Sequence, residues 1–250
     1  MDETLHGMLI ANAGILLEYR GTKILIDGLY QVTDNPFSDI PPDILRRLLD
    51  GEPPYDGVDC LLFTHRHSDH FSAELTLEYT QRRRPKILLL PPGVWESQSW
   101  PRDYLAEQGI PYVLPSCMDE RTLVPGVTVR SFSTRHLDKQ YWEVPHSCLL
   151  LTLGEKRVLF TADVDYTSET FPGLPPLDAV FVNPLFFRAL RAEKFFHGIL
   201  PAKAVCVYHI PFPEDDCGQM RPTLKRDVER WPPERGKVIL FTEPGRWEEL

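Results

Sequence analysis

Long apolar runs are absent from this sequence. No stretch approaches the roughly 18 apolar residues that suggest a membrane span. A basic leader is absent as well, because the chain starts MDETLHGMLI, with acidic residues where a secretion signal would carry basic ones. We therefore expect a soluble, cytoplasmic protein without membrane contact, and its 250 residues suffice for one domain spanning residues 1–250.

Cysteine is scarce and badly placed for a structural role. The chain has five cysteines, an odd number, and none of them stand in CxxC spacing. A disulfide framework and a cysteine zinc site are both disfavoured by this pattern. The cysteines are expected to be reduced thiols.

Positive charge is also in short supply. The 27 lysines and arginines are outnumbered by 36 acidic residues, which gives a formal net charge of −9. Extended nucleic-acid binding loses its electrostatic driving force on such a surface, so a small-molecule substrate is favoured over nucleic acid. The sequence is compatible with a homo-oligomer and with a monomer, and does not choose between them.

Short apolar runs of strand length recur along the chain and outnumber the helical segments. Strands are predicted at residues 15–19, 23–26, 60–64, 86–90, 127–132, 148–153, 157–161, 179–182, 204–208 and 238–241. Helices are predicted at residues 42–49, 72–83, 102–108, 188–200 and 221–230. Each half contains two apolar runs joined by a short turn, so we predict an α+β sandwich of two sheets with helices outside.

Proline is abundant, with 24 residues, and it clusters between the predicted elements. The segment of residues 28–59 carries five prolines together with Tyr30, Phe37 and Tyr55. Two interpretations stay open at this point: an insertion that forms a lid over a site, or a surface connection without contact to substrate.

The most informative segment is LLFTHRHSDH, residues 61–70. Three histidines and an aspartate follow an apolar run within six residues: His65, His67, Asp69 and His70. Extended backbone would point His65 and His67 to one side, and a turn into the next helix would direct Asp69 and His70 to a second point nearby. Imidazole and carboxylate ligands suit zinc, iron or manganese.

Other apolar runs end in residues of the same type. The runs VTVRSFSTRH, RVLFTAD, AVCVYH and KILID lead to His136, Asp163, His209 and Asp27. Strand ends at one edge of a sandwich bring distant loops together, so these side chains are predicted to converge with the 65–70 segment.

These residues resemble the metallo-β-lactamase superfamily, whose HxHxDH signature stands here at His65 to His70. The resemblance extends over about residues 8–241 and implies an αββα four-layer sandwich. It implies that His65, His67 and His136 hold one metal, that Asp69, His70 and His209 hold a second, and that Asp163 bridges them. It further gives Asp27 the role of orienting the HxHxDH loop through hydrogen bonds.

The resemblance also implies a dinuclear hydrolase whose cofactors are two divalent metal ions, with zinc favoured and manganese or iron as alternatives. Paired metals lower the pKa of a shared water and make it nucleophilic at neutral pH. Catalytic roles fall to Asp69, which would hold the nucleophile, and to His209, which would stabilise developing negative charge through its metal.

Departures from known branches narrow the activity. Asp163 stands where one antibiotic-degrading branch has cysteine, and LDKQYWEVPH follows His136 in place of the sequence typical of glyoxalase II. His67 replaces the glutamate of the redox di-iron members. The compact length is similar to the branch that contains ascorbate-6-phosphate lactonase. We therefore predict hydrolysis of a small ester, lactone or phosphodiester; the alternative is a metal-binding or regulatory protein without turnover.

Several nearby residues have two open interpretations. Basic residues could bind a substrate phosphate or carboxylate, or be ordinary surface charges. Tyr141 and Trp142 could form an apolar wall or pack the loop. Two further histidines do not fit the family's ligand positions and are expected to be structural. The basic residues are Arg135, Lys139, Arg188 and Arg191, and the histidines are His146 and His197.

Overall fold

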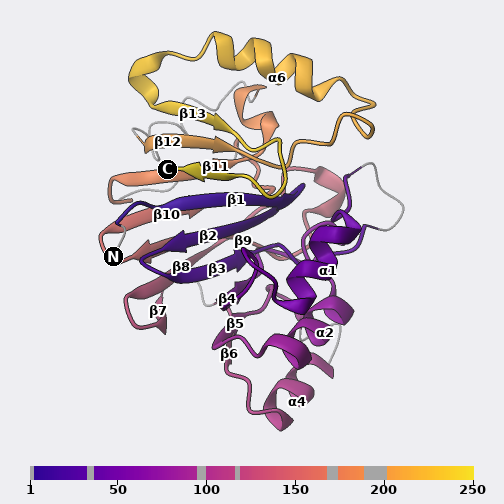
Figure 1. The fold of residues 1–250 in the computed structure, drawn as a ribbon. Helices are drawn as coiled ribbons and strands as arrows, with labels where there is room; N and C mark the ends of the chain where they lie inside the picture. Colours follow the sequence, from indigo (N-terminus) through magenta and orange to yellow (C-terminus); the bar gives the residue numbers. More distant parts are fainter. Residues whose placement is uncertain (1–2, 33–36, 95–99, 116–118, 168–173, 189–201) are drawn as a thin grey trace.

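Two mixed β-sheets pack face to face in this computed structural model, with helices on the outer faces (Figure 1). The structure describes residues 3–32, 37–94, 100–115, 119–167, 174–188 and 202–250. Within those ranges, none of the helices has the length and apolar character needed to cross a membrane.

The first sheet holds seven strands in the order β14-β1-β2-β3-β4-β5-β6. Its antiparallel half is formed by strands close in sequence or by the returning chain end, and its other half is parallel. The strands are β1 (His6–Ala11), β2 (Gly14–Tyr19), β3 (Thr22–Ile26), β4 (Val58–Leu62), β5 (Ile87–Leu89), β6 (Tyr112–Val113) and β14 (Trp247–Glu249).

The second sheet repeats this plan in the order β13-β12-β11-β10-β9-β8-β7. Strands β7 to β10 are antiparallel neighbours, and β10 to β13 are parallel. The strands are β7 (Glu120–Val124), β8 (Val127–Thr134), β9 (His146–Leu153), β10 (Lys156–Phe160), β11 (Leu177–Val182), β12 (Ala202–Val207) and β13 (Lys237–Leu240).

Apolar side chains from both sheets form the central core. Residues such as Leu17, Leu62, Leu151, Phe160 and Phe181 are fully buried there. Parallel strands buried on both faces carry continuous apolar runs. Strands β11 and β12 show this pattern, with the runs AVFV and AVCV. Two further apolar clusters lie on the outer faces, between each sheet and its helices.

Helices α1 (Pro42–Asp50), α2 (Ala73–Arg83) and α4 (Trp100–Glu107) cover the first sheet, and α6 (Met220–Glu229) lies on the outer side of the second (Figure 1). In α1, Ile44 and Leu48 are one turn apart and both are buried, while Gly51 ends the helix in the left-handed conformation. The Ser72 hydroxyl accepts a hydrogen bond from the Leu75 N–H and so caps α2 directly after the HxHxDH segment.

The αββα sandwich predicted from the sequence is confirmed, and all ten predicted strands are present. Four of the five predicted helices are present, and the fifth, at residues 188–200, lies outside the described residues apart from Arg188. The sequence analysis missed four strands: β1, β6, β7 and β14. The last three are short or polar edge strands, whose pairing depends on neighbours that are distant in sequence.

Candidate metal centre

Strand ends meet at one edge of the sandwich and supply the chemistry-bearing side chains. Strands β3 and β4 run parallel in the first sheet. In the second sheet β8 runs in the same direction as β10 and β12, because β9 is antiparallel to both β8 and β10. The ends of these five strands are followed within three residues by Asp27, His65, His136, Asp163 and His209.

Backbone hydrogen bonds fix the loops that follow these strands. The Leu137 N–H donates to the Asp163 carbonyl at 2.7 Å, and the Ser147 N–H donates to the Thr64 carbonyl at 3.1 Å. The second bond joins a loop of one sheet to a strand of the other. Asp27 and His209 themselves have φ values of 48° and 58°, in the left-handed region that costs non-glycine residues about 1 kcal/mol or more.

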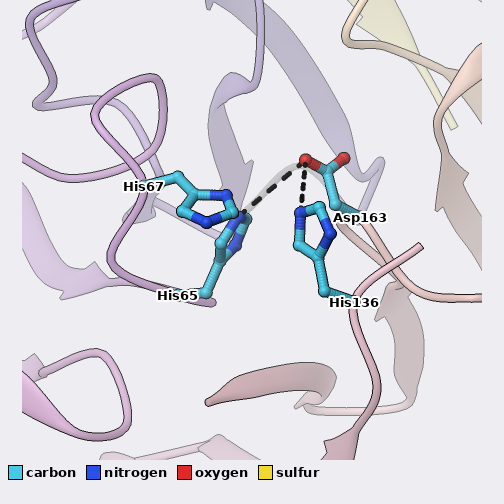
Figure 2. A group of neighbouring side chains, drawn as sticks. All are labelled: His65, His67, His136 and Asp163. Atoms are coloured by element: carbon cyan, nitrogen blue, oxygen red, sulfur yellow. Dashed lines mark hydrogen bonds and ion pairs between the residues drawn. The ribbon is translucent and has the colours of Figure 1, made fainter. Parts of the chain in front are cut away.

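A first group of ligand-type side chains contains His65, His67, His136 and Asp163 (Figure 2). The Nε2 atom of His65 lies 3.1 Å from Nδ1 of His67. The Asp163 Oδ2 atom lies 3.9 Å from Nε2 of His65 and 3.6 Å from Nε2 of His136. One ligand atom from each of the four residues lies within 4.8 Å of all the others.

A second group contains Asp69, His70, His209 and again Asp163. The Nε2 atoms of His70 and His209 are 3.2 Å apart, and the His209 Nε2 is also 3.2 Å from Asp69 Oδ2. Asp163 lies 3.4 Å from His70 and 3.6 Å from His209. The structure thus brings together all seven residues predicted from the sequence, in two groups that share Asp163.

Asp27 lies beneath the HxHxDH loop and is fully buried. Its carboxylate accepts the Thr64 N–H at 2.8 Å and the Thr64 hydroxyl at 2.6 Å, and its Oδ2 lies 2.8 Å from Nδ1 of His70. A proton on Nδ1 of His70 is therefore held by Asp27, and Nε2 is directed at the second group. The hydrogen-bonding role predicted for Asp27 is confirmed.

Two residues that the sequence analysis did not select orient Asp163. The Asn183 amide nitrogen lies 3.4 Å from Asp163 Oδ1, and the Asp163 N–H donates to His146 Nε2 at 3.1 Å. His146 belongs to neither group, as expected, but it is buried against His65. Asn183 directly follows β11, so the search for polar residues at the ends of apolar runs, which selected Asp163, could have selected Asn183 too. His197 lies outside the described residues.

Unpartnered atoms in the cluster show that the residues fit cations. Among the described residues, His67 Nε2 and His136 Nε2 are buried without a hydrogen-bond partner, and the buried Asp69 Oδ2 has an ion pair with His209 Nε2 at 3.2 Å. Buried polar atoms in folded proteins nearly always have a partner. Imidazole nitrogens and carboxylate oxygens are the donors that zinc, manganese and iron accept, so divalent cations would satisfy these atoms.

The two groups differ in charge when no cation is present. Burial lowers the pKa of His65 well below its usual value, and burial together with His136 lowers the pKa of His67 to about 4. Burial also disfavours protonation of His209, but Asp163 and Asp69 outweigh it and raise its pKa to about 9. His70 follows the same logic, since Asp69 and Asp27 overcome burial and raise its pKa well above normal.

This difference predicts that the cation-free protein loses stability as pH rises. A histidine with a raised folded-state pKa stabilises the fold fully below its unfolded pKa and loses that contribution as pH rises through its folded pKa. For His209 the window runs from about 6.5 to about 9, and the loss is roughly 3 kcal/mol. In chelator, the Tm should fall by several degrees between pH 6.5 and 9.5.

Saturation with zinc is the control for this pH series. Bound cations would replace the protons on Nε2 of His70 and His209, so most of the fall in Tm with pH should disappear. The thiols of Cys60 and Cys206 do not titrate in the window, since burial raises the pKa of Cys60 to about 12 and that of Cys206 further. A Tm in chelator that stays constant or rises with pH would contradict the protonation of His70 and His209.

A cavity of about 380 Å³ opens beside the cluster and is lined by His67, Asp69, His136, Asp163 and His209. Phe37, from the 28–59 segment, also lines the cavity. Its ring packs edge-on against the ring of His209, with the two ring centroids 4.8 Å apart. Tyr141 lines the cavity and contacts the ring of His67, with centroids 4.5 Å apart, whereas Trp142 is not among the described lining residues. Of the two interpretations left open for this loop, the apolar wall applies to Tyr141.

A family model described as "Beta-lactamase superfamily domain" matches residues 23–206. None of the curated protein sequences matches the chain significantly.

Several solved structures share the fold at low sequence identity. The metallo hydrolase Igni18 from Ignicoccus hospitalis is 16% identical with a TM-score of 0.62, over 99% of this chain and 98% of its own. An isothiocyanate hydrolase from Delia radicum gut bacteria is 16% identical with a TM-score of 0.59, over 97% and 98% of the chains. The diiron β-hydroxylase CmlA from Streptomyces venezuelae is 15% identical with a TM-score of 0.60, over 100% of this chain and 54% of its own.

Proposed function

The chain belongs to the beta-lactamase superfamily. From this premise we propose that it is a dinuclear metal-dependent hydrolase of small esters, lactones or phosphodiesters. The observation that carries the proposal is Asp163, whose two carboxylate oxygens face ligand atoms of both groups at 3.4 to 3.9 Å. A carboxylate between two sets of histidines is the arrangement that a pair of cations needs.

The proposed ligand assignment follows the two groups. His65, His67 and His136 would hold one cation, Asp69, His70 and His209 would hold the other, and Asp163 would contact both. Two bound divalent cations would lower the pKa of a shared water toward 7 and polarise the bond to be hydrolysed. Zinc is the cation we favour. Manganese and iron are alternatives, because histidine and aspartate ligands accept all three metals.

The chain's own residues would position the reaction. Asp69 Oδ2 is buried and lines the cavity, so this carboxylate can hold a nucleophile and accept its proton. The His209 Nε2 atom lies 3.2 Å from Asp69 Oδ2, and His209 also lines the cavity. There it would help to stabilise developing negative charge. Phe37 and Tyr141 would restrict the access of bulk water to these groups.

Other parts of the proposal rest on the sequence. We propose a small-molecule substrate, a cytoplasmic location and a single domain without nucleic-acid or membrane partners. Within residues 28–59, Phe37 would contribute to a lid, whereas α1 packs on the first sheet. The Phe37–His209 contact supports the lid. Kinship with the ascorbate-6-phosphate lactonase branch stays a prediction.

Metal analysis and a substrate panel test the proposal together. We expect the wild type to bind about two equivalents of zinc and to hydrolyse at least one member of a panel of chromogenic esters, lactones and bis-phosphodiesters. His67→Ala should lower kcat/KM by roughly a thousandfold, because it removes a ligand to a cation that contributes several kcal/mol. His6→Ala, on β1, is the matched control and should leave activity unchanged.

Two results would count against the hydrolase. Protein that binds two equivalents of zinc but hydrolyses nothing in the panel would favour a binding or regulatory protein. A His67→Ala variant with full activity and a native circular dichroism spectrum would show that the activity does not use this cluster.

A further inference from the structure

The cavity beside the cluster has an apolar wall, which we define as Phe37, Leu137, Tyr141, Pro184, Leu185 and Met220. These six residues come from four segments: the loop after Tyr30, the His136 loop, the turn after β11, and the start of α6. Tyr141 and Leu185 are 40% and 39% exposed, so a bound ligand could cover apolar surface on both. Of the other eight described lining residues, five belong to the cluster and three are Asp138, Asn183 and Gln140, so the apolar wall is the part of the cavity suited to the apolar portion of a ligand.

Three basic side chains near the cavity have contacts of their own, and a fourth, Arg66, lines an adjoining cleft that shares His67 and Tyr141 with the cavity. Arg135 donates to Asp165 at 2.6 Å and lies over the Trp142 ring at 4.2 Å. Arg188 pairs with Asp227 at 3.6 Å, beside a neighbouring cleft. Lys139 lies 5.8 Å from the Trp142 ring centroid. The interpretation of these three as ordinary surface charges fits their contacts, while Arg191 lies outside the described residues.

Charge along the cavity is acidic rather than basic. Among the described lining residues there is no lysine or arginine, and Asp138 adds a carboxylate to those of the cluster. Two divalent cations would offset the carboxylates of Asp27, Asp69 and Asp163, so the cluster itself would be close to neutral. An anionic group distant from the cations would therefore meet apolar side chains, the Gln140 amide or Asp138, and no lysine or arginine among the described lining residues would offset its charge.

We propose that this cavity selects an uncharged ester or lactone whose apolar group lies against the apolar wall, and that it discriminates against substrates with an anionic group at the far end. This inference rests on the proposed hydrolase function and narrows its substrate class. A distal phosphate would find no lysine or arginine among the described lining residues, so substrates that carry one are expected to be poor.

A matched pair of esters tests the inference on the metal-loaded protein. p-Nitrophenyl hexanoate and the mono-p-nitrophenyl ester of adipic acid share the leaving group and the acyl length, and differ by a carboxylate at the far end. We expect kcat/KM to be at least tenfold higher for the hexanoate. Across p-nitrophenyl acetate, butanoate and hexanoate it should rise by up to about fourfold per methylene, as apolar burial predicts.

Leu185→Lys places a cation on the wall and should lower the hexanoate-to-adipate ratio at least fivefold. The matched control is Leu114→Lys, because Leu114 is 38% exposed against 39% for Leu185 and is not among the described lining residues. The control should keep the wild-type ratio. A wild-type ratio near one, or a Leu185→Lys ratio equal to that of Leu114→Lys, would overturn the inference.

A binding measurement separates this inference from the proposed function. Titration calorimetry with 2-octanone and 7-oxooctanoate, which are not hydrolysed, should show tighter binding of the ketone by the wild type and a smaller preference in Leu185→Lys. If no ester is hydrolysed but this preference is present, the hydrolase proposal fails and the selectivity of the cavity stands. Tighter binding of 7-oxooctanoate by the wild type would overturn the selectivity even if hydrolysis is observed.

Discussion

Asp163→Asn is expected to lower kcat/KM by roughly a thousandfold or more and to reduce bound zinc from about two equivalents to one or none. Asp163 is the one described residue that belongs to both ligand groups, and its carboxylate is buried among four histidines. Burial alone would raise its pKa, but His209 and hydrogen bonds from the surrounding histidines hold the pKa well below the usual range. Asparagine keeps the shape but removes the charge that two cations would share.

Zinc content is measured by atomic emission and activity with the best ester of the panel. Asp119→Asn is the matched control, since it removes the same charge from a carboxylate whose side chain is 69% exposed. It should retain both zinc and activity. Two equivalents of zinc in Asp163→Asn would show that this carboxylate is not shared between cations.

The cation-free variant offers a second readout. Without the Asp163 charge, the pKa of His209 should fall toward its ordinary value, because Asp163 is the main group that raises it. The fall in Tm between pH 6.5 and 9.5 in chelator should then become smaller than in the wild type. A variant that merely disturbed folding would lower Tm at every pH without changing this slope.

The positions of the ligands could be predicted from the sequence because two local rules were sufficient. A strand buried on both faces needs an unbroken apolar run, and its first polar residue marks where the strand leaves the core. Asp163 and His209 each follow such a run, whereas His136 follows β8, in which apolar and polar residues alternate. Parallel crossovers then place these ends at one edge of the sheets, so side chains up to 139 positions apart, such as His70 and His209, approach to 3.2 Å.

The walls of the site could not be read in the same way. Phe37 reaches His209 from a proline-rich loop, and Arg135 turns to Asp165 and Trp142 instead of the cavity. Both outcomes depend on side-chain packing between loops that share no periodic pattern. The edge strand β14 was missed for a related reason, since WEE is polar and pairs with β1 at the other end of the chain.

Asp27→Ala is expected to destabilise the protein by about 3 kcal/mol or more and to weaken zinc binding 10- to 100-fold. The substitution leaves the Thr64 N–H and the Nδ1 proton of His70 buried without their acceptor, and removes one of two partners of the Thr64 hydroxyl, which also lies 3.0 Å from His65 Nδ1. Alanine is also strained at the φ of 48° that Asp27 adopts. Urea unfolding and zinc titration against a competing chelator measure the two effects separately.

Two further variants separate stability from cation affinity. Asp27→Asn retains an oxygen for the Thr64 N–H and tolerates the left-handed backbone, so it should recover most of the stability while zinc binding stays about tenfold weaker.

Asp59→Ala is the matched control, because Asp59 accepts the Lys23 N–H at 3.0 Å at the opposite end of β3 and β4. It should cost about 1 kcal/mol and leave zinc affinity unchanged. Equal losses of affinity in Asp27→Ala and Asp59→Ala would mean that Asp27 acts through general stability, whereas a loss confined to Asp27 ties the affinity to the orientation of His70.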